Sequence, residues 1–594
     1  MARSHPLGSS AALAIALLMV GSPFAADAGT ALTPNEAAAE IDRLVASELA
    51  EQEIVPASLA DDETFLRRLA LDVAGRYPTE GEIAAFALDP SDDRVGDRID
   101  QLLDSDGYGD RWARYWTATI YSRATQTRAA APNRRAFEGW LAEQFDAGRG
   151  WDAIVSNLIT ATGNTAENPA TAFLFAHAGE TAEIAGEASR VFMGIQISCA
   201  QCHDHPFDRW KRTDFHEFAA FFPRVQMVPR RDGVRISFEV RGMTRERTQP
   251  EPRQLFAFAD RNRDGELEQS EMPGRLRQAF QYLSRVADRD QSGTLSLQEV
   301  LTAPPPPVRA GGAMEHEMPN LSDPTQPGEV VSPKLFATGD GLPLGTSDTE
   351  RRLAAAAYLT SAENVWFARA VVNRYWNELL GEGFYVPVDD LGPDRAPVLP
   401  EVLDVLVDGF VASGYDLRWL VSTIAQTTAY RRQVSAENAD YAVAATAGLM
   451  PSRKRGDQIY DSILAALGGR ENRDARGPNP TEREFVSELF GPDPSIATAD
   501  QPGTIPQALF LMNAKPLEQM LQADRRGGLS DLLKTAGGDR EALSKIYLHV
   551  LGREPRTEEV SLMLRHVRSA GSRPEGFEDI VWSLLNSAEF LARR

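Results

Sequence analysis

The only two cysteines of the chain lie close together and are followed directly by a histidine. Cys199, Cys202 and His203 form the pattern Cys-x-x-Cys-His within a chain of 594 residues. This pattern attaches a c-type haem, with both sulfurs in thioether bonds and the histidine as the proximal iron ligand. The sequence therefore predicts haem c as a cofactor at this segment. Four residues are candidates for the distal iron ligand: Met193, Met227, His205 and His216.

The same stretch holds more histidines and carboxylates than a haem attachment needs. Sulfur and imidazole nitrogen are also ligands for zinc and iron, so a Cys₂His₂ site, or a site with one open position, is an alternative. In a site with an open position, a nearby carboxylate would act as the base. The ligands would come from Cys199, Cys202, His203, His205 and His216, with Asp204 or Asp208 as the base.

A disulfide is the third interpretation of the cysteine pair. Thiols of an exported protein oxidise readily, so Cys199 and Cys202 could form a short-loop disulfide while the histidines hydrogen-bond in a turn. His177 and His316 are weaker candidates for the same neighbourhood, because a lone histidine is more often a structural residue. The sequence leaves haem, another metal and a disulfide open.

Two acidic loops of one pattern lie downstream. Residues 260–271 and 288–299 follow the EF-hand calcium loop, in which oxygens at fixed positions bind the ion and a glycine makes the sharp turn. Leu267 and Leu295 occupy the position where paired loops form a short β contact. The sequence predicts calcium binding by a compact pair of loops that acts as a structural clamp. The predicted ligands are Asp260, Asn262, Asp264, the Glu266 carbonyl, Glu268 through water, Glu271, Asp288, Asp290, Ser292, Thr294 and Glu299.

The N-terminus has the features of an export signal. Arg3 and His5 precede an apolar run over residues 11–20, and Ala26-Asp27-Ala28 supplies a cleavage site. We therefore expect a signal peptide over residues 1–28 and a mature protein in the periplasm or outside the cell. No other apolar run is long enough to span a membrane. A formal net charge of −23 gives no cationic field for nucleic acid, so no nucleic-acid partner is expected.

Hydrophobic periodicity predicts a mainly α-helical, multidomain protein. A helix over residues 180–197 leads directly into the Cys-x-x-Cys-His motif, Pro206 stops its continuation, and a second helix covers residues 213–222. A small β-hairpin follows within residues 225–240, and Pro229 places its first strand at a sheet edge. Aromatic side chains are expected to fill the core of the first half: Trp112, Tyr115, Trp116, Trp140 and Trp151.

Two adjacent carboxylates lie in a loop of the second half. Asp389 and Asp390 follow a predicted helix that carries Arg369 and Arg374, which are natural ion partners. A catalytic role is one interpretation of such a pair. Helix capping or a buried salt bridge is the expected one.

Composition divides the chain into five parts. They are the signal peptide (1–28), a helical domain with the Cys-x-x-Cys-His motif (29–245), the EF-hand pair (251–303), a linker rich in proline and glycine (304–346) and a second helical domain (347–594).

Both helical domains contain segments with a recognisable sequence. These segments are residues 65–72, 108–116 and 190–210 in the first domain, and 364–374, 387–391, 413–417 and 504–510 in the second. They resemble the planctomycete cytochrome-C-like domain family and its C-terminal partner domain, with the EF-hand pair as an insert between them. The resemblance implies domains of unknown function whose cytochrome name reflects the Cys-x-x-Cys-His motif.

Three functions are compatible with these features. The leading hypothesis is an exported calcium-binding protein with c-type haem electron transfer in the cell envelope, and a redox or envelope protein as its partner. The alternative is a metal-dependent hydrolase that acts on envelope or extracellular polymers. The third is a calcium-stabilised structural or interaction protein.

Overall fold

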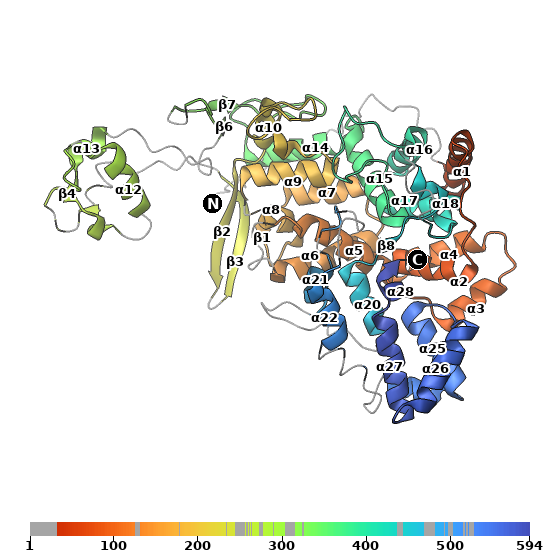
Figure 1. Ribbon diagram of the computed structural model, residues 1–594. Helices are drawn as coiled ribbons and strands as arrows, with labels where there is room; N and C mark the ends of the chain where they lie inside the picture. Colours follow the sequence, from red (N-terminus) through yellow and green to blue (C-terminus); the bar gives the residue numbers. More distant parts are fainter. Residues whose placement is uncertain are drawn as a thin grey trace, which may run out of the picture.

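The computed structural model shows a mainly α-helical, multidomain protein, which confirms the predicted fold class (Figure 1). The expected signal peptide lies outside the described residues. The structure describes residues 32–593 except 125–130, 178, 233–234, 244–255, 257–258, 261, 263, 273–276, 289, 303–314, 324–325, 436–442, 468–481, 492, 497–502, 515–516, 518–520 and 522–527.

Within its described residues, the first half of the chain forms ten helices, and some of them have ordinary caps. Asp61, for example, caps α2 with its side chain, and Gly75 ends that helix in the left-handed conformation. The helices are α1 (Pro34–Glu51), α2 (Asp62–Ala74), α3 (Glu80–Leu88), α4 (Arg94–Leu103), α5 (Asp106–Tyr121), α6 (Ala131–Asp146), α7 (Trp151–Thr160), α8 (Ala172–Ala176), α9 (Thr181–Met193) and α10 (Arg212–Ala219).

The second half is also helical. Its first helices pack on the first half, and α15 lies against α9 while α14 lies against α7. The helices are α14 (Asp348–Leu359), α15 (Val365–Leu380), α16 (Pro400–Ala412), α17 (Leu417–Gln426), α18 (Thr428–Arg431), α19 (Ala444–Ala447), α20 (Gly456–Leu467), α21 (Glu482–Phe490), α22 (Ile505–Asn513), α24 (Leu529–Thr535), α25 (Asp539–Leu551), α26 (Thr557–Ser569), α27 (Arg573–Leu585) and α28 (Ala588–Leu591).

The strands are short and peripheral. β1 (Gly163–Asn164), β2 (Val225–Asp232) and β3 (Arg235–Gly242) form an antiparallel sheet in the order β1-β3-β2. Pro229 therefore lies on an edge strand, as predicted. Three two-stranded pairs complete the set: β4 (Glu266–Leu267) with β5 (Leu295–Ser296), β6 (His316–Met318) with β7 (Glu329–Val331), and β8 (Ser452–Arg453) with β9 (Ala592–Arg593).

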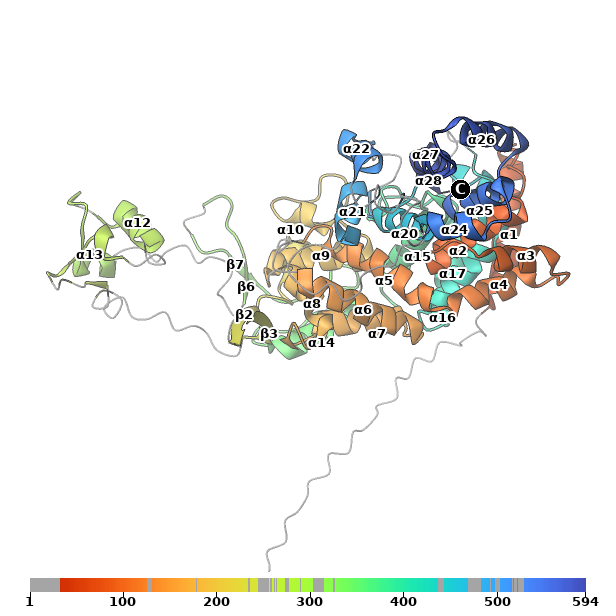
Figure 2. The same cartoon turned by 90° about the horizontal axis from the view of Figure 1, so that it is seen from below.

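The hydrophobic side chains form three separate cores. The largest runs from Ala37 to Ala447 and contains residues of both expected helical domains, so these domains share one core. A second core, from Ile459 to Phe590, lies among the C-terminal helices. The third belongs to the segment that the sequence predicted to be an EF-hand pair, with α12 (Arg277–Val286) and α13 (Leu297–Thr302), and both views draw this segment apart from the helical body (Figures 1 and 2).

The aromatic residues of the first half pack in the shared core, as predicted. Trp112 stacks on Tyr375 with ring centroids 4.1 Å apart, and Trp116 lies 4.0 Å from Trp151. Trp112, Trp116 and Trp151 are fully buried. Since Tyr375 belongs to α15, these rings join the first half of the chain to the second.

Asp389 forms the buried salt bridge that the sequence predicted. It is 2% exposed, and its carboxylate lies 3.0 Å from the Arg190 guanidinium and 3.8 Å from that of Arg374. Burial alone would raise the pKa of Asp389, but Arg374 and Arg190 hold it below its usual range. Arg369 was expected as a partner too, but it pairs with Asp404 at 3.2 Å because it projects from a more exposed face of α15.

Replacing Asp389 with asparagine should destabilise the fold strongly, because it removes the buried charge that Arg190 and Arg374 share and leaves Arg190 with Glu187 alone. We expect Asp389→Asn to lower the free energy of unfolding by about 3–5 kcal/mol, measured by urea denaturation. The neighbouring Asp390 pairs with Arg395 and is partly exposed, so Asp390→Asn is the matched control and should cost less than about 1 kcal/mol. Equal losses in the two variants would contradict this account.

Candidate functional site

The Cys-x-x-Cys-His motif lies on a surface turn just after α9. Gly194 ends α9 with φ of 67°, and its carbonyl accepts a hydrogen bond of 2.8 Å from the Leu391 N–H. A Cβ at Gly194 would lie 2.8 Å from the Leu391 side chain, so this close approach requires glycine. The chain therefore leaves the helix at a point fixed by the second half of the protein.

The turn itself exposes its reactive side chains and buries its apolar residues. The 3-10 turn η2 (Ile197–Ala200) buries Ile197 and Ala200, while Cys199, Cys202 and His203 are exposed. Both cysteines are free thiols in this structure. The two sulfurs and the imidazole are thus open to a reagent or a prosthetic group.

His203 has a defined tautomer. Its Nδ1 lies 2.7 Å from the carbonyl oxygen of Asp204, and because a carbonyl only accepts, Nδ1 carries the hydrogen. The lone pair of Nε2 is then free to bind a metal, and a hydrogen bond from the other ring nitrogen is what orients a metal-binding histidine. This geometry suits the expected proximal iron ligand.

His216 lies beside the motif but is used as a support. Its Nε2 donates to the carbonyl of Gln201 at 3.1 Å, and its Nδ1 accepts from Nε2 of His316 at 2.9 Å. Both imidazoles are buried, at 3% and 6% exposure, and burial lowers the pKa of each to about 4. Since both nitrogens of His216 are engaged, it can bind a metal only if this arrangement is broken.

The remaining polar side chains of the segment bond to its own backbone. Asp204 accepts from the Arg212 N–H at 3.0 Å, Asp208 accepts from the Arg209 N–H at 2.8 Å, and His205 accepts from the Phe207 N–H at 3.3 Å. Within the described residues, no three ligand atoms of this segment come within 4.8 Å of one another. The structure therefore does not bring the expected zinc or iron ligands together.

The exposed cysteines suit covalent haem attachment, and His203 suits one of the two axial positions of the iron. Both thiols are accessible, and Nε2 of His203 is available as an axial ligand. Of the distal candidates, Met193 is fully buried in the core and His216 is engaged, while Met227 is half-buried on β2 and His205 is half-buried on the turn. Phe207, four residues after His203, exposes 80% of its surface and offers apolar contact beside the motif.

The expected linker supplies part of this site, which sequence reasoning missed. β6 packs on α10 and contributes His316, and Phe336 packs against Trp210 with ring centroids 4.9 Å apart. The proline and glycine content of residues 304–346 suggested an extended connection, and that signal said nothing about what the segment contacts. His316, noted only as a weak candidate, was the one residue that pointed to this contact.

The two loops that were predicted to bind calcium have the expected pairing. β4 and β5 join them, with Leu267 opposite Leu295 and both leucines buried, which confirms the expected β contact. In the second loop, the carboxylates of Asp288, Asp290 and Glu299 converge, with their ligand oxygens within 4.8 Å of one another.

The first loop has the same backbone plan but a less convergent set of carboxylates. The Gly265 N–H donates to Asp260 at 3.1 Å, as the Gly293 N–H donates to Asp288 at 3.0 Å in the second loop. Glu271 accepts from the backbone N–H groups of Asn262 and Glu268, each at 3.1 Å. Oδ1 of Asp260 is buried and has no hydrogen-bond partner among the described residues.

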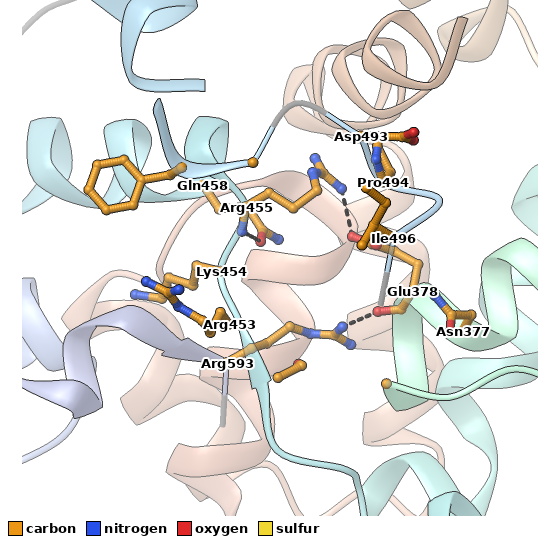
Figure 3. Close-up of a pocket in the computed structure, with 14 residues that line it drawn as sticks. Asn377, Glu378, Arg453, Lys454, Arg455, Gln458, Asp493, Pro494, Ile496 and Arg593 are labelled. Atoms are coloured by element: carbon orange, nitrogen blue, oxygen red, sulfur yellow. Dashed lines mark hydrogen bonds and ion pairs between the residues drawn. The ribbon is translucent and has the colours of Figure 1, made fainter. Parts of the chain in front are cut away.

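A polar pocket that the sequence did not suggest lies where α15, β8 and β9 meet (Figure 3). Arg455 donates to the Glu378 carboxylate at 2.6 Å, and Arg593 donates to the Glu378 carbonyl. Lys454 donates to the hydroxyl of Tyr77, and burial lowers the pKa of this lysine to about 8. Arg455 also pairs with Asp457 and Arg593 with Asp72, so the pocket wall is largely a junction of paired charges between the two large cores.

His177 lies in the core and does not join the motif. It is fully buried against Phe173, and neither ring nitrogen has a hydrogen-bond partner among the described residues. Burial lowers its pKa to about 4 from an ordinary value near 6.5. Between pH 6.5 and 4 the unfolded chain therefore binds a proton at this residue that the folded chain does not.

His177 should make the fold less stable as the pH falls from 6.5 towards 4. In His177→Leu, the slope of unfolding free energy against pH in this window should fall by up to about 1.4 kcal/mol per pH unit, measured by urea denaturation. Phe175→Leu, a core substitution in α8, the helix that ends just before His177, should lower stability without changing the slope. If unfolding free energy in His177→Leu depends on pH as it does in the wild type, folding does not lower the pKa of this imidazole.

Two family models match the chain, one in each half. Within the described residues, no helix combines the length and the apolar character needed to cross a membrane. No curated protein and no solved structure matches the chain. The family described as protein of unknown function DUF1549 (PSCyt2) matches residues 40–227, and DUF1553 (PSD1), also of unknown function, matches residues 351–499. The chain therefore carries the planctomycete-type pair of a cytochrome-C-like domain and its partner domain, as the sequence resemblance predicted.

Proposed function

We propose that the protein is an exported calcium-binding protein, with the ions held by the paired loops 260–271 and 288–299. The observation that carries the proposal is the convergence of Asp288, Asp290 and Glu299 within 4.8 Å. Three carboxylates at this distance repel one another, and a divalent cation removes that repulsion.

The surrounding backbone supports the same interpretation. Gly265 and Gly293 have φ of 86° and 83°, which is the sharp turn that lets the loop wrap around an ion. The β4–β5 contact joins the two loops, so binding in one loop orders the other. Oδ1 of Asp260, which is buried and has no partner within the described part of the chain, is a further oxygen suited to a cation. The small core of this segment, around Phe256, makes a unit that calcium would stabilise.

Calcium should raise the melting temperature of this segment, and removal of the last ligand of each loop should abolish the rise. An ion at 100 times its Kd adds about 2.7 kcal/mol to the stability of the state that binds it. We expect Glu271→Ala with Glu299→Ala to lose both this rise and the heat of calcium binding in titration calorimetry. Gln298→Ala, an exposed neighbour on α13, is the control and should bind as the wild type does. An unchanged rise in the double variant would mean that calcium does not bind in these loops.

A second function is proposed for the exposed Cys-x-x-Cys-His turn. We propose that Cys199 and Cys202 attach a c-type haem and that His203 is its proximal ligand, with electron transfer to a protein partner in the cell envelope. The hydrogen bond from Nδ1 of His203 to Asp204 favours this proposal, because it leaves Nε2 as the ligand atom. A bound haem would supply an iron that changes its charge by one electron. Export to the periplasm or beyond agrees with this chemistry, since such attachment occurs outside the cytoplasm.

Haem attachment predicts an absorbance that survives acid-acetone extraction. The full chain made in a host with a haem-attachment system should show this absorbance, and Cys199→Ser with Cys202→Ser should lose it. Ser198→Ala, which changes an adjacent residue of the same turn, should keep it. Colourless protein with stoichiometric zinc or iron would favour the metal-dependent hydrolase instead. Colourless protein with neither metal and a Cys199–Cys202 disulfide would favour the calcium-stabilised structural protein.

A further inference from the structure

We infer that residues 315–342, called the strap, position the Cys-x-x-Cys-His turn, and that His316 is the positioning residue at its centre. The strap lies between the EF-hand segment and α14, and residues 324–325 within it are not described. The inference rests on the proposed redox function in one respect, which is the reason why the turn would need a fixed position. The contacts themselves do not depend on which group the cysteines carry.

A polar route runs from the strap to the middle of the motif. His316 donates through Nε2 to Nδ1 of His216, and His216 donates through Nε2 to the carbonyl of Gln201. Gln201 lies between Cys199 and Cys202. The carbonyl can only accept, which fixes one direction for both hydrogen bonds as long as the two imidazoles are neutral.

The same two imidazoles also pack as a unit. Their rings lie edge to edge across this hydrogen bond, with centroids 5.2 Å apart and planes 25° apart, and both are buried. Hydrogen bonds in such a buried position are stronger than in water, and a broken one leaves an unsatisfied buried polar group. The backbone of the turn is therefore held at Gln201 by a chain that begins on the strap.

An apolar route reaches the other end of the turn. Phe336 of the strap packs edge-on against Trp210 and against Phe218 of α10, with centroid distances of 4.9 and 5.5 Å. The carbonyl of Trp210 accepts a hydrogen bond of 2.7 Å from the His205 N–H. Since His205 closes the turn after His203, Phe336 holds the segment that closes it.

The strap is itself fixed to the helical body. Glu315 accepts from Arg224 at 2.7 Å and from the fully buried Arg351, and the Lys334 N–H donates to the Glu217 carbonyl at 3.0 Å. A clamp of this kind gives the two sulfurs and the His203 imidazole one fixed geometry, although all three are exposed to solvent. Fixed geometry at an exposed redox group sets its potential and lowers the reorganisation that accompanies electron transfer.

Hydrogen exchange in the full chain without haem tests the inference directly. In His316→Ala, the backbone amides of Gln201 and His205 should exchange about fivefold to tenfold faster than in the wild type, because a hydrogen bond of ordinary strength is lost. The equilibrium constant between the Cys199–Cys202 dithiol and its disulfide, measured in glutathione buffers, should change by a similar factor. His316→Gln keeps an N–H donor near the position of Nε2 and should restore both values.

Two further variants complete the test. Phe336→Leu should speed exchange at His205 more than at Gln201, which separates the apolar route from the polar one. Lys334→Ala removes an exposed ammonium 3.8 Å from Glu217 on the same strap, and should leave exchange in the turn within about twofold of the wild type. If His316→Ala does not fold, His316→Asn, which places its amide nitrogen short of the Nε2 position, replaces it in the comparison with His316→Gln.

Wild-type exchange and an unchanged thiol equilibrium in the folded His316 variant would overturn the inference. So would an equal effect of His316→Gln and of His316→Ala, or of His316→Asn in its place, since the hydrogen bond would then not matter. Failure of the haem proposal gives a different result. Colourless protein would leave the exchange pattern as expected, because that pattern is measured on the chain without haem.

Discussion

Buried arginines, paired with carboxylates or carbonyls from distant parts of the chain, hold the helical body together. Arg190 binds both Glu187 on its own helix and Asp389 in the second half, and Arg593 at the C-terminal end binds Asp72 near the start. Removing one partner of such a pair leaves a buried charge and costs about 3–5 kcal/mol. Because the Arg190–Asp389 and Arg593–Asp72 pairs join residues 199 and 521 positions apart, they bind the two halves into one unit.

The shared core follows from the same constraint. Arg352 of α14 donates to the carbonyls of Ile159 and Ala161 at the end of α7, and Arg68 of α2 donates to the carbonyls of Tyr430 and Arg432. These guanidinium groups thus donate hydrogen bonds to carbonyls at the end of a helix or turn, where the element itself offers no donor. The apolar residues between these anchors then pack without a boundary between the halves. Two family domains in one sequence have become one packed body.

This body explains why an exposed motif can still be well placed. The end of α9 is fixed by Leu391, the middle of the turn by His216 and the end of the turn by Trp210. The supports come from the second half, from α10 and from the strap. Calcium binding, by contrast, is proposed for a segment with its own small core and its own strand pair. The two proposed functions therefore rest on separately built parts of the molecule.

Much of the local structure could be predicted because its causes are local. Four features depend only on residue types and spacing that the sequence displays. They are the helix before the motif, the hairpin with Pro229 at its edge, the β contact of Leu267 with Leu295 and the buried salt bridge of Asp389. The end of the first helix was predicted at residue 197, whereas α9 ends at Met193, because Gly194 meets Leu391 there. Gly194 was itself a local signal for this end, whereas its contact with Leu391, nearly two hundred residues away, left none.

The sequence by itself determined which groups are available: two thiols, a histidine beside them, and two loops of oxygen ligands in calcium-binding order. Only the tertiary structure decided how they are used. It made His216 a support for Gln201 and turned an expected linker into a wall of the site, since His316 lies one hundred residues away along the chain. Side-chain types fix the chemistry that a residue can perform. Its neighbours in space decide which nitrogen carries the hydrogen and which atoms remain free to react.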